Sequence, residues 1–282
     1  MRLVRYGEKG KEKPGLVDKS GQIRDLSAHL PDLAGDALSP ASLSKIAGLD
    51  PTKLPAVSGS PRIGAAVGGS PKFIAIGLNY SDHANEVGLA IPTEPIIFMK
   101  ATSSLCGPND DVIIPKGSEK TDYEVELGIV IGATARNIAL QDAAKHIAGY
   151  CVVNDVSERE FQIERGGQWT KGKSADTFCP IGPWLVTADE VPDPGKLALW
   201  TEVNGERRQN SNTGDLIFGV DEIVSYVSQF TTLLPGDVIP TGTPSGVGMG
   251  FKPPKFLKPG DRVRLSVEGL GEQNQRLVAF SG

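Results

Sequence analysis

The sequence predicts an α+β protein that is mainly β, with a small N-terminal β-rich domain followed by a larger one. Three observations favour this class. The 282 residues include 34 glycines and 21 prolines, nearly a fifth of the chain where average usage gives roughly an eighth, so turns should be frequent. Short β-rich runs recur along the chain, and helical patterns are few. A helical bundle is therefore disfavoured.

The first part of the chain reads as short strands and turns. Residues 2–6, 15–18 and 23–26 are the expected strands, and 42–47 is a possible helix. Residues 50–72 contain four prolines and four glycines, a composition typical of a linker or an extended wrap. We therefore predict a small N-terminal domain with its linker over 1–72 and a second domain over 73–282.

The second part repeats short apolar runs and shows no internal repeat. The expected strands are 73–76, 96–99, 112–114, 124–131, 150–153, 184–186, 198–203, 237–240 and 262–267. The expected helices are 81–87, 140–147, 157–165 and 220–230.

Charge and rare residues exclude several classes of function. The formal net charge is −5 and the pI about 5.4, which argues against the basic footprint of a nucleic-acid-binding protein. Three His and three Cys, with neither C-x-x-C nor H-E-x-x-H, are a poor basis for a zinc centre or a disulfide framework. No secretory h-region or membrane span is visible. We expect a soluble, cytoplasmic protein with reduced cysteines.

Three carboxylates stand at the ends of predicted strands. In the run 123–131, alternation places Glu124 and Glu126 on one face, with Cβ atoms about 7 Å apart. The run 150–155 ends in Asp155, and strand ends are common positions for site residues. Together the three could bind a hard cation. The glutamates equally fit a half-buried strand with its polar face in water, and Asp155 a turn or cap.

A capping-box pattern at residues 157–160 predicts the start of a helix. On that helix Arg159 and Gln162 lie three apart, on one face, and could share a cavity with Asp155. A surface ion pair and a solvated amide are the alternatives.

Residues 167–174 satisfy G-x-x-x-x-G-K-S letter for letter. A phosphate-binding loop must follow a buried strand and open a helix, whereas a polar helical pattern precedes this segment and two prolines follow it. We therefore expect no P-loop. The segment can instead supply Lys173 as an ammonium beside a metal site, where it stabilises a developing anion.

Two further segments carry candidate groups. The glycine-dense loop 241–250 fails the dinucleotide-binding pattern, so it is either a pocket loop in which Thr243 offers a hydroxyl or a sharp β-turn. On the predicted helix capped by Ser81, His83 and Glu86 stand three apart and can meet. A carboxylate beside an imidazole makes it a better general base; a structural histidine is the alternative.

These motifs together make the chain resemble the fumarylacetoacetate hydrolase family. The matching stretches follow the family's order across residues 73–250: IAIGLNYSDHANEVG, PIIFMKATSSLCGP, DYEVELGIVIG, VVNDVSEREFQ, KGKSADTFCPIGPW and TGTPSGVG. The opening MRLVRYG and the late GFKPPKFLKPGDRVRLSVEGLG look like the bacterial branch labelled ureidoglycolate lyase or 2,4-diketo-3-deoxy-sugar-acid hydrolase.

The resemblance implies a mixed β-roll catalytic domain, a homodimer and one Mg²⁺ or Mn²⁺ per subunit. By position, it places Glu124, Glu126 and Asp155 on the metal. It assigns substrate-holding positions to four residues, which are Arg159, Gln162, Lys173 and Thr243. It places His83 and Glu86 on a mobile lid over 81–90. Lys100 lies near the family's pocket and receives no role.

The implied reaction is hydrolytic cleavage of a 2,4-diketo acid, an acylpyruvate or a diketo-deoxy sugar acid, with release of pyruvate. Glu86 orients His83 to activate water, and Lys173 with the metal stabilises the leaving enolate. Ureidoglycolate lyase and oxaloacetate decarboxylase activities remain alternatives on the same scaffold. A nucleotide-binding protein that uses residues 167–174 and a non-catalytic binding module are the rivals from other classes.

Overall fold

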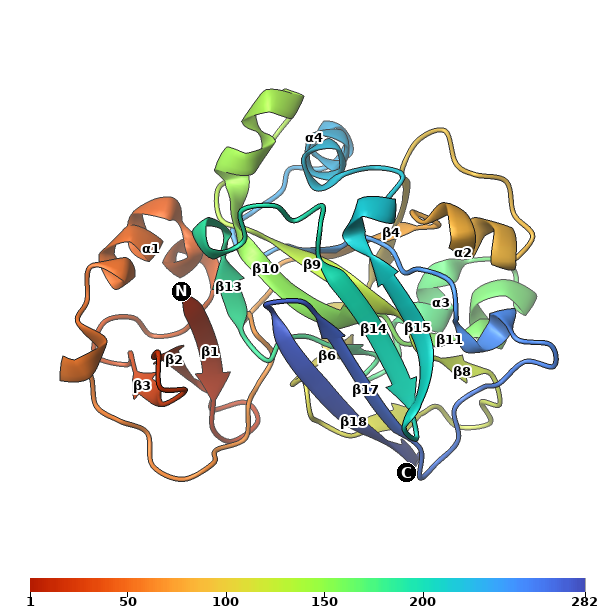
Figure 1. Cartoon of the computed structure of the whole chain (residues 1–282), viewed down its shortest axis with the longest axis horizontal. Coiled ribbons are helices and arrows are strands. Elements are labelled where there is room, and N and C mark those ends of the chain that lie inside the picture. The colour runs from red at the N-terminus through yellow and green to blue at the C-terminus, as the bar shows by residue number, and fades with distance from the viewer. Residues whose placement is uncertain (282) are drawn as a thin grey trace.

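The structure, a computed structural model, describes residues 1–281 and is built around a nine-stranded mixed sheet (Figure 1). Its strand order is β3-β2-β1-β13-β10-β9-β16-β4-β5. The strands are β1 (Arg2–Tyr6), β2 (Lys13–Val17), β3 (Ile23–Asp25), β4 (Phe73–Gly77), β5 (Ile96–Lys100), β9 (Val125–Ile131), β10 (Ile147–Asn154), β13 (Leu185–Thr187) and β16 (Val238–Pro240). All nine coincide with runs predicted from the sequence to within a few residues.

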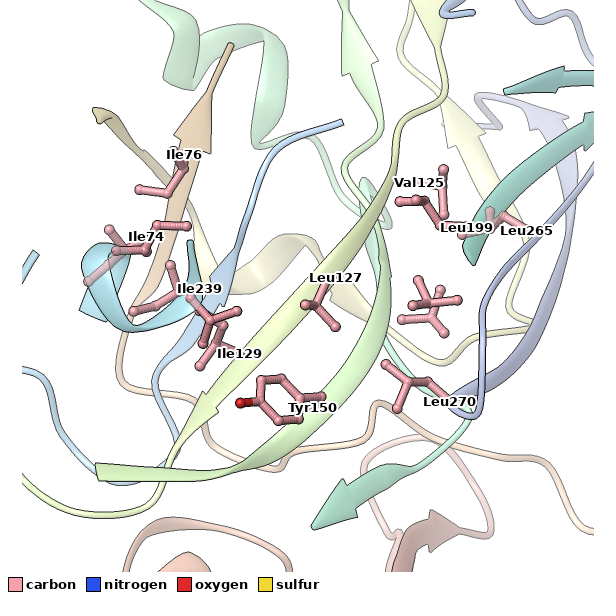
Figure 2. Close-up of a cluster of buried hydrophobic side chains, with 14 of the residues drawn as sticks. Ile74, Ile76, Val125, Leu127, Ile129, Tyr150, Leu199, Ile239, Leu265 and Leu270 are labelled. Atoms are coloured by element: carbon pink, nitrogen blue, oxygen red, sulfur yellow. The ribbon is translucent and has the colours of Figure 1, made fainter. Parts of the chain in front are cut away.

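A second sheet packs on the first and closes the main core. Its order is β15-β14-β17-β18-β7. Its strands are β7 (Val112–Ile114), β14 (Ala198–Val203), β15 (Glu206–Asn212), β17 (Arg262–Val267) and β18 (Gly271–Ala279). Figure 2 shows Val125 of β9 beside Leu199 of β14 and Leu265 of β17, all fully buried. Because apolar alternation on β9 fills the space between the sheets, the mainly-β prediction is confirmed.

Short elements connect and cover these sheets. Two-stranded pairs join β6 (Leu105–Cys106) to β12 (Cys179–Pro180) and β8 (Thr121–Asp122) to β11 (Ser157–Glu158). The α-helices are α1 (Pro40–Ala47), α2 (Ser81–Glu86), α3 (Trp169–Lys173) and α4 (Val220–Phe230). The 3-10 turns are Gly35–Leu38, Pro51–Lys53, Thr102–Ser104, Leu140–His146, Ala188–Glu190, Thr213–Asp215 and Gly248–Gly250, and Glu160–Glu164 is a π-helical turn. Within residues 1–281 no helix is both long and apolar enough to cross a membrane.

The predicted helix over 157–165 is wrong in its first part. Ser157 pairs with Asp122 in the β11–β8 ladder, and its hydroxyl donates to the Asp155 carbonyl (2.9 Å) instead of capping a helix. Helical structure begins only at Glu160. The predicted cap of α2 is also displaced by one residue, because Tyr80 occupies the N-cap position and Ser81 is helical. Tertiary pairing overrode the local capping signals at these sites.

Two polar strands were missed altogether. β15 (ERRQNSN) and β18 (GEQNQRLVA) lack a regular apolar alternation, yet both pair along their length with apolar neighbours. The ladder with β14 or β17 holds them in place, together with buried polar side chains such as Gln209 and Gln273 that hydrogen-bond to neighbouring segments.

The N-terminal segment continues the large sheet. Strand β1 pairs antiparallel with β13, so the red strands β1, β2 and β3 on the left of Figure 1 extend the sheet whose centre is β9 and β10. Leu3 and Leu16 share a buried cluster with Val130 and Leu185. Residues 50–72 run as an extended wrap, with isolated bridges at residues 56 and 63. The domain boundary at residue 72 stays a prediction.

Candidate active site

The ends of four strands meet at one edge of the large sheet. β9 and β10 are antiparallel with Val125 opposite Asn154, which places Glu124, just before β9, beside Asp155, just after β10. The Asp155 N–H donates to the Glu124 carbonyl (2.9 Å). β4 and β16 run parallel to each other and antiparallel to β9, so Gly77 and the loop 241–250 arrive at the same edge. The strand topology therefore gathers segments far apart in the sequence.

Three buried carboxylates face one another at this edge. Glu124, Glu126 and Asp155 each offer an oxygen, and these oxygens lie within 4.8 Å of one another. The Lys173 ammonium donates to Glu124 Oε2 (2.7 Å) and to Asp155 Oδ2 (2.8 Å). Arg159 Nη2 lies 2.7 Å from Glu124 Oε1. The sequence pairing of Glu124 and Glu126 thus belongs to a buried acidic cluster, not to a solvated strand face.

The two glutamates sit in opposite electrostatic environments. Burial alone would raise the pKa of Glu124, but the charges of Lys173 and Arg159 outweigh it and hold the pKa at about 2. Burial raises the pKa of Glu126 well above its usual 4.5, and the charges of Asp155 and Glu124 raise it further. Because a divalent cation would supply the missing positive charge beside Glu126, and all three donors are hard oxygens, this cluster fits Mg²⁺ or Mn²⁺.

Lys100 supports the cluster from behind. Its fully buried ammonium pairs with Asp155 Oδ1 and donates to the carbonyls of Val156 (3.1 Å) and Phe178 (3.0 Å). Three acceptors match the three N–H bonds of an ammonium. Lys100, to which the sequence assigned no role, therefore fixes the orientation of Asp155.

Asp122, which sequence reasoning missed, holds Arg159 in the same way. Its carboxylate accepts from Arg159 Nε (2.9 Å) and from the backbone N–H groups of Gly248 (2.6 Å) and Met249 (3.0 Å). Arg159 Nη1 donates to Gln162 Oε1 (3.0 Å), so the two side chains lie together as their predicted shared face requires, although the local helix is not the predicted one. The position of Asp122 directly before the 123–131 run was the available signal.

The loop 241–250 contributes both backbone and side chain. Gly242 donates its N–H to Glu126 Oε2 (2.7 Å), and the Thr243 hydroxyl donates to the Val125 carbonyl (2.9 Å). Gln209 of the polar strand β15 donates to Thr243 Oγ1 (2.8 Å) and accepts from the Val125 N–H (3.1 Å). Thr243 is thus fixed by Gln209, a residue that no sequence pattern indicated.

Helix α2 carries the predicted His–Glu pair and lies docked on that loop. His83 Nδ1 and Glu86 Oε2 are 3.3 Å apart. The other oxygen of Glu86 accepts from the Gly246 N–H (2.9 Å), and Asp82 accepts from the Ser245 hydroxyl (2.7 Å). When Nδ1–H donates to Glu86, Nε2 is the nitrogen able to accept a proton.

One cavity of about 320 Å³ unites these groups. It is lined by eight of the nine candidate residues: His83, Glu124, Glu126, Asp155, Arg159, Gln162, Lys173 and Thr243. Glu86 does not line it and touches the cavity only through His83. The segment 167–174 lines it with Trp169 and Lys173 of helix α3. Because a π-helical turn rather than a strand precedes this helix, the P-loop geometry is absent from the segment.

The chain is similar to known proteins in both sequence and fold. Residues 72–278 match the family described as fumarylacetoacetate (FAA) hydrolase C-terminal. A provisionally named hydrolase of Burkholderia orbicola (strain MC0-3) is 64% identical over 277 residues, 98% of each chain. The structure of maleylpyruvate hydrolase from Sphingobium sp. SYK-6, solved with manganese(II) and pyruvate, is 30% identical with a TM-score of 0.80 over 100% of each chain. That of 5-carboxymethyl-2-hydroxymuconate delta-isomerase from Mycobacterium smegmatis is 34% identical with a TM-score of 0.77, again over 100% of each chain.

Proposed function

Because the chain belongs to the fumarylacetoacetate hydrolase family, we propose that it is a metal-dependent hydrolase that cleaves a carbon–carbon bond in a 2,4-diketo acid and releases pyruvate. Acylpyruvates and 2,4-diketo-3-deoxy sugar acids are the two substrate classes. The observation that carries the proposal is the single cavity in which a carboxylate triad, Lys173 and His83 meet. The manganese and pyruvate in the structure of the maleylpyruvate hydrolase to which the chain is similar support it.

In this proposal Glu124, Glu126 and Asp155 hold Mg²⁺ or Mn²⁺. The bound ion supplies Lewis-acid polarisation of a 2-keto acid. Arg159, Gln162 and Thr243 orient the substrate. Each of these side chains is buried and already held by protein partners, so little reorganisation is needed when the substrate binds.

His83 acts as the general base, and Lys173 stabilises the negative charge that develops on the substrate. His83, oriented by Glu86, takes a proton from water, and the resulting hydroxide attacks the C4 ketone. The C3–C4 bond then breaks, its electron pair leaves as the enolate of pyruvate, and the acyl group leaves as a carboxylic acid. The Lys173 ammonium, whose pKa is raised by Asp155 and Glu124 against the opposing effect of burial, stays protonated and stabilises the enolate. Transfer to C3 of the proton that His83 took from water completes pyruvate and restores the neutral imidazole.

The test measures pyruvate release from acylpyruvates, diketo-deoxy sugar acids and oxaloacetate, glyoxylate release from ureidoglycolate, and isomerisation of 5-carboxymethyl-2-hydroxymuconate. We expect pyruvate from a diketo acid, loss of that activity in EDTA, and its return with Mg²⁺ or Mn²⁺. Full activity in the metal-stripped protein would contradict the metal assignment. Turnover of oxaloacetate or ureidoglycolate alone would make the protein a decarboxylase or a lyase. The family resemblance also supports a homodimer, which sedimentation velocity would detect.

A further inference from the structure

The cavity is lined by a charged cluster and by a set of large apolar side chains, which we call its charged half and its apolar half. The charged half consists, among the residues described, of the three carboxylates, Arg159 and Lys173, and the His83 imidazole also lines the cavity. The apolar half consists of eight large apolar side chains: Ile76, Leu78, Val87, Leu89, Phe98, Ile163, Trp169 and Met249. In the proposed reaction, the pyruvate half of the substrate occupies the charged half. The acyl group on the other side of the cleaved bond then contacts the apolar half of the cavity.

An aromatic pair forms one wall of the apolar half. The rings of Phe98 and Trp169 meet edge to face with centroids 5.3 Å apart. Trp169 lies directly on strand β4, where a Cβ added to Gly77 would come within 2.4 Å of the indole. Glycine at this strand end therefore gives the indole its place beside the substrate path.

Both cations that line the cavity are already neutralised. Arg159 is paired with Asp122 and Glu124, and Lys173 with Glu124 and Asp155. The Lys173 ammonium lies 5.2 Å from the centroid of the Phe98 ring, but it already has two carboxylate partners. A carboxylate on the far end of a substrate would therefore enter the apolar half without an unpaired cation to bind, and hydroxyl groups there would lose hydrogen bonds to water without gaining side-chain partners. Both losses oppose binding.

We propose that the group beyond the cleaved bond is an uncharged apolar acyl group, alkyl or aryl, and that Phe98, Ile163 and Trp169 select it. This inference rests on the proposed function, because it takes the charged half as the pyruvate site. It separates an apolar acylpyruvate from the dicarboxylic and polyhydroxylated diketo acids that the same charged half would accept.

The first test compares two stable ligands that differ only at the far end. In the presence of Mg²⁺, 2-oxohexanoate should bind the full-length protein at least ~10-fold more tightly than 2-oxoadipate, as measured by calorimetry. Each further methylene, up to 2-oxooctanoate, should tighten binding by roughly fourfold until the apolar half is full. Equal or tighter binding of 2-oxoadipate would overturn the inference.

The second test places a cation in the apolar half. Ile163 lines the cavity and is 49% exposed, so Ile163→Lys adds an ammonium where the far carboxylate would lie. This variant should narrow or reverse the preference for 2-oxohexanoate over 2-oxoadipate. Phe230 is 65% exposed and lies outside the cavity, which makes Phe230→Lys the matched control that keeps the preference. An unchanged preference in Ile163→Lys would overturn the assignment.

Pyruvate release distinguishes the two proposals. If no 2,4-diketo acid is cleaved while 2-oxohexanoate still binds more tightly than 2-oxoadipate, the proposed reaction is wrong and the apolar selectivity of the site stands. If a dicarboxylic diketo acid is cleaved faster than benzoylpyruvate or an alkyl acylpyruvate, the reaction stands and the inference is wrong.

Discussion

Among single residues, Glu126 is the member of the acidic cluster whose carboxylate is held by a backbone N–H, that of Gly242, while Glu124 and Asp155 share Lys173. Burial raises the pKa of Glu126, and repulsion from the negative charges of Asp155 and Glu124 raises it further. A bound divalent ion would replace this repulsion between carboxylates with attraction of each carboxylate to the ion. Metal binding should accordingly stabilise the fold.

The raised pKa of Glu126 predicts a pH dependence in the metal-free protein. Above pH about 5 the unfolded chain has lost this proton, because its glutamate titrates near the usual 4.5, whereas the folded protein retains it. The free energy of unfolding in EDTA should therefore fall as pH rises from about 5 towards the raised pKa of Glu126. Urea unfolding at several pH values measures this fall.

The matched variants for this prediction are Glu126→Gln and Glu222→Gln. Glu126→Gln removes the titrating group and should flatten the decline, while exposed Glu222 serves as the control that leaves it unchanged. Parallel declines in the wild type and Glu126→Gln would show that other groups cause the dependence. With Mg²⁺ present, Glu126→Gln should weaken metal binding.

The catalytic role of His83 can be tested separately from metal binding. We expect His83→Ala to lower kcat by at least ~10² because the general base is lost, while the Mg²⁺ affinity measured by calorimetry is retained. His29, exposed and outside the cavity, gives the control His29→Ala. An unchanged kcat in His83→Ala would remove this residue from the reaction.

At the scale of elements, the docking of α2 on the loop 241–250 decides whether the cavity is covered. Two carboxylates of this short helix, those of Asp82 and Glu86, bind the loop, with Ser245 and Gly246 as their partners. The helix has only six residues, too few to be stable alone. These contacts are therefore needed to keep His83 over the site.

Asp82→Ala tests this docking. Loss of hydrogen bonds of about 0.5–1.5 kcal/mol each should lower kcat/KM by roughly three- to tenfold and speed amide hydrogen exchange in residues 81–86. Asp50→Ala, which removes a comparable capping contact to Thr52 in the N-terminal part, should do neither. Unchanged exchange in Asp82→Ala would show that other contacts hold the helix.

At the scale of the whole molecule, the pairing of β1 with β13 joins the predicted N-terminal domain to the large sheet. The cluster of Leu3, Leu16, Val130 and Leu185 would lose half its members if the first 72 residues were removed. A shared sheet and a shared core should unfold cooperatively.

We therefore expect one calorimetric unfolding transition for the full chain, and no stable folded protein from residues 73–282 alone. Cleavage at a protease site inserted near Ser58, in an exposed stretch of the wrap, should leave the two pieces associated. Two separate transitions, or a stable 73–282 fragment, would support independent domains.

Much of the candidate site was predictable because its members follow local periodicities. Strand alternation put Glu124 and Glu126 together, and helical spacing paired His83 with Glu86. The capping pattern at Ser157 led to a wrong helix start, because the Ser157 hydroxyl donates to the Asp155 carbonyl and its backbone pairs with β8 instead of capping a helix. The role of Gln209 could not be predicted, because its strand β15 has no apolar alternation that would indicate a strand.

The sequence by itself determined the mainly-β class, the buried alternation of β9 and the pairing of Glu124 with Glu126 and of His83 with Glu86, because each depends on the repeat of one strand or helix. Only the tertiary structure decided that Lys100 fixes Asp155, that Asp122 fixes Arg159, and that Phe98 meets Trp169 across Gly77. These contacts join residues 37 to 92 positions apart in the sequence. They are set by strand order and packing, which no local pattern records.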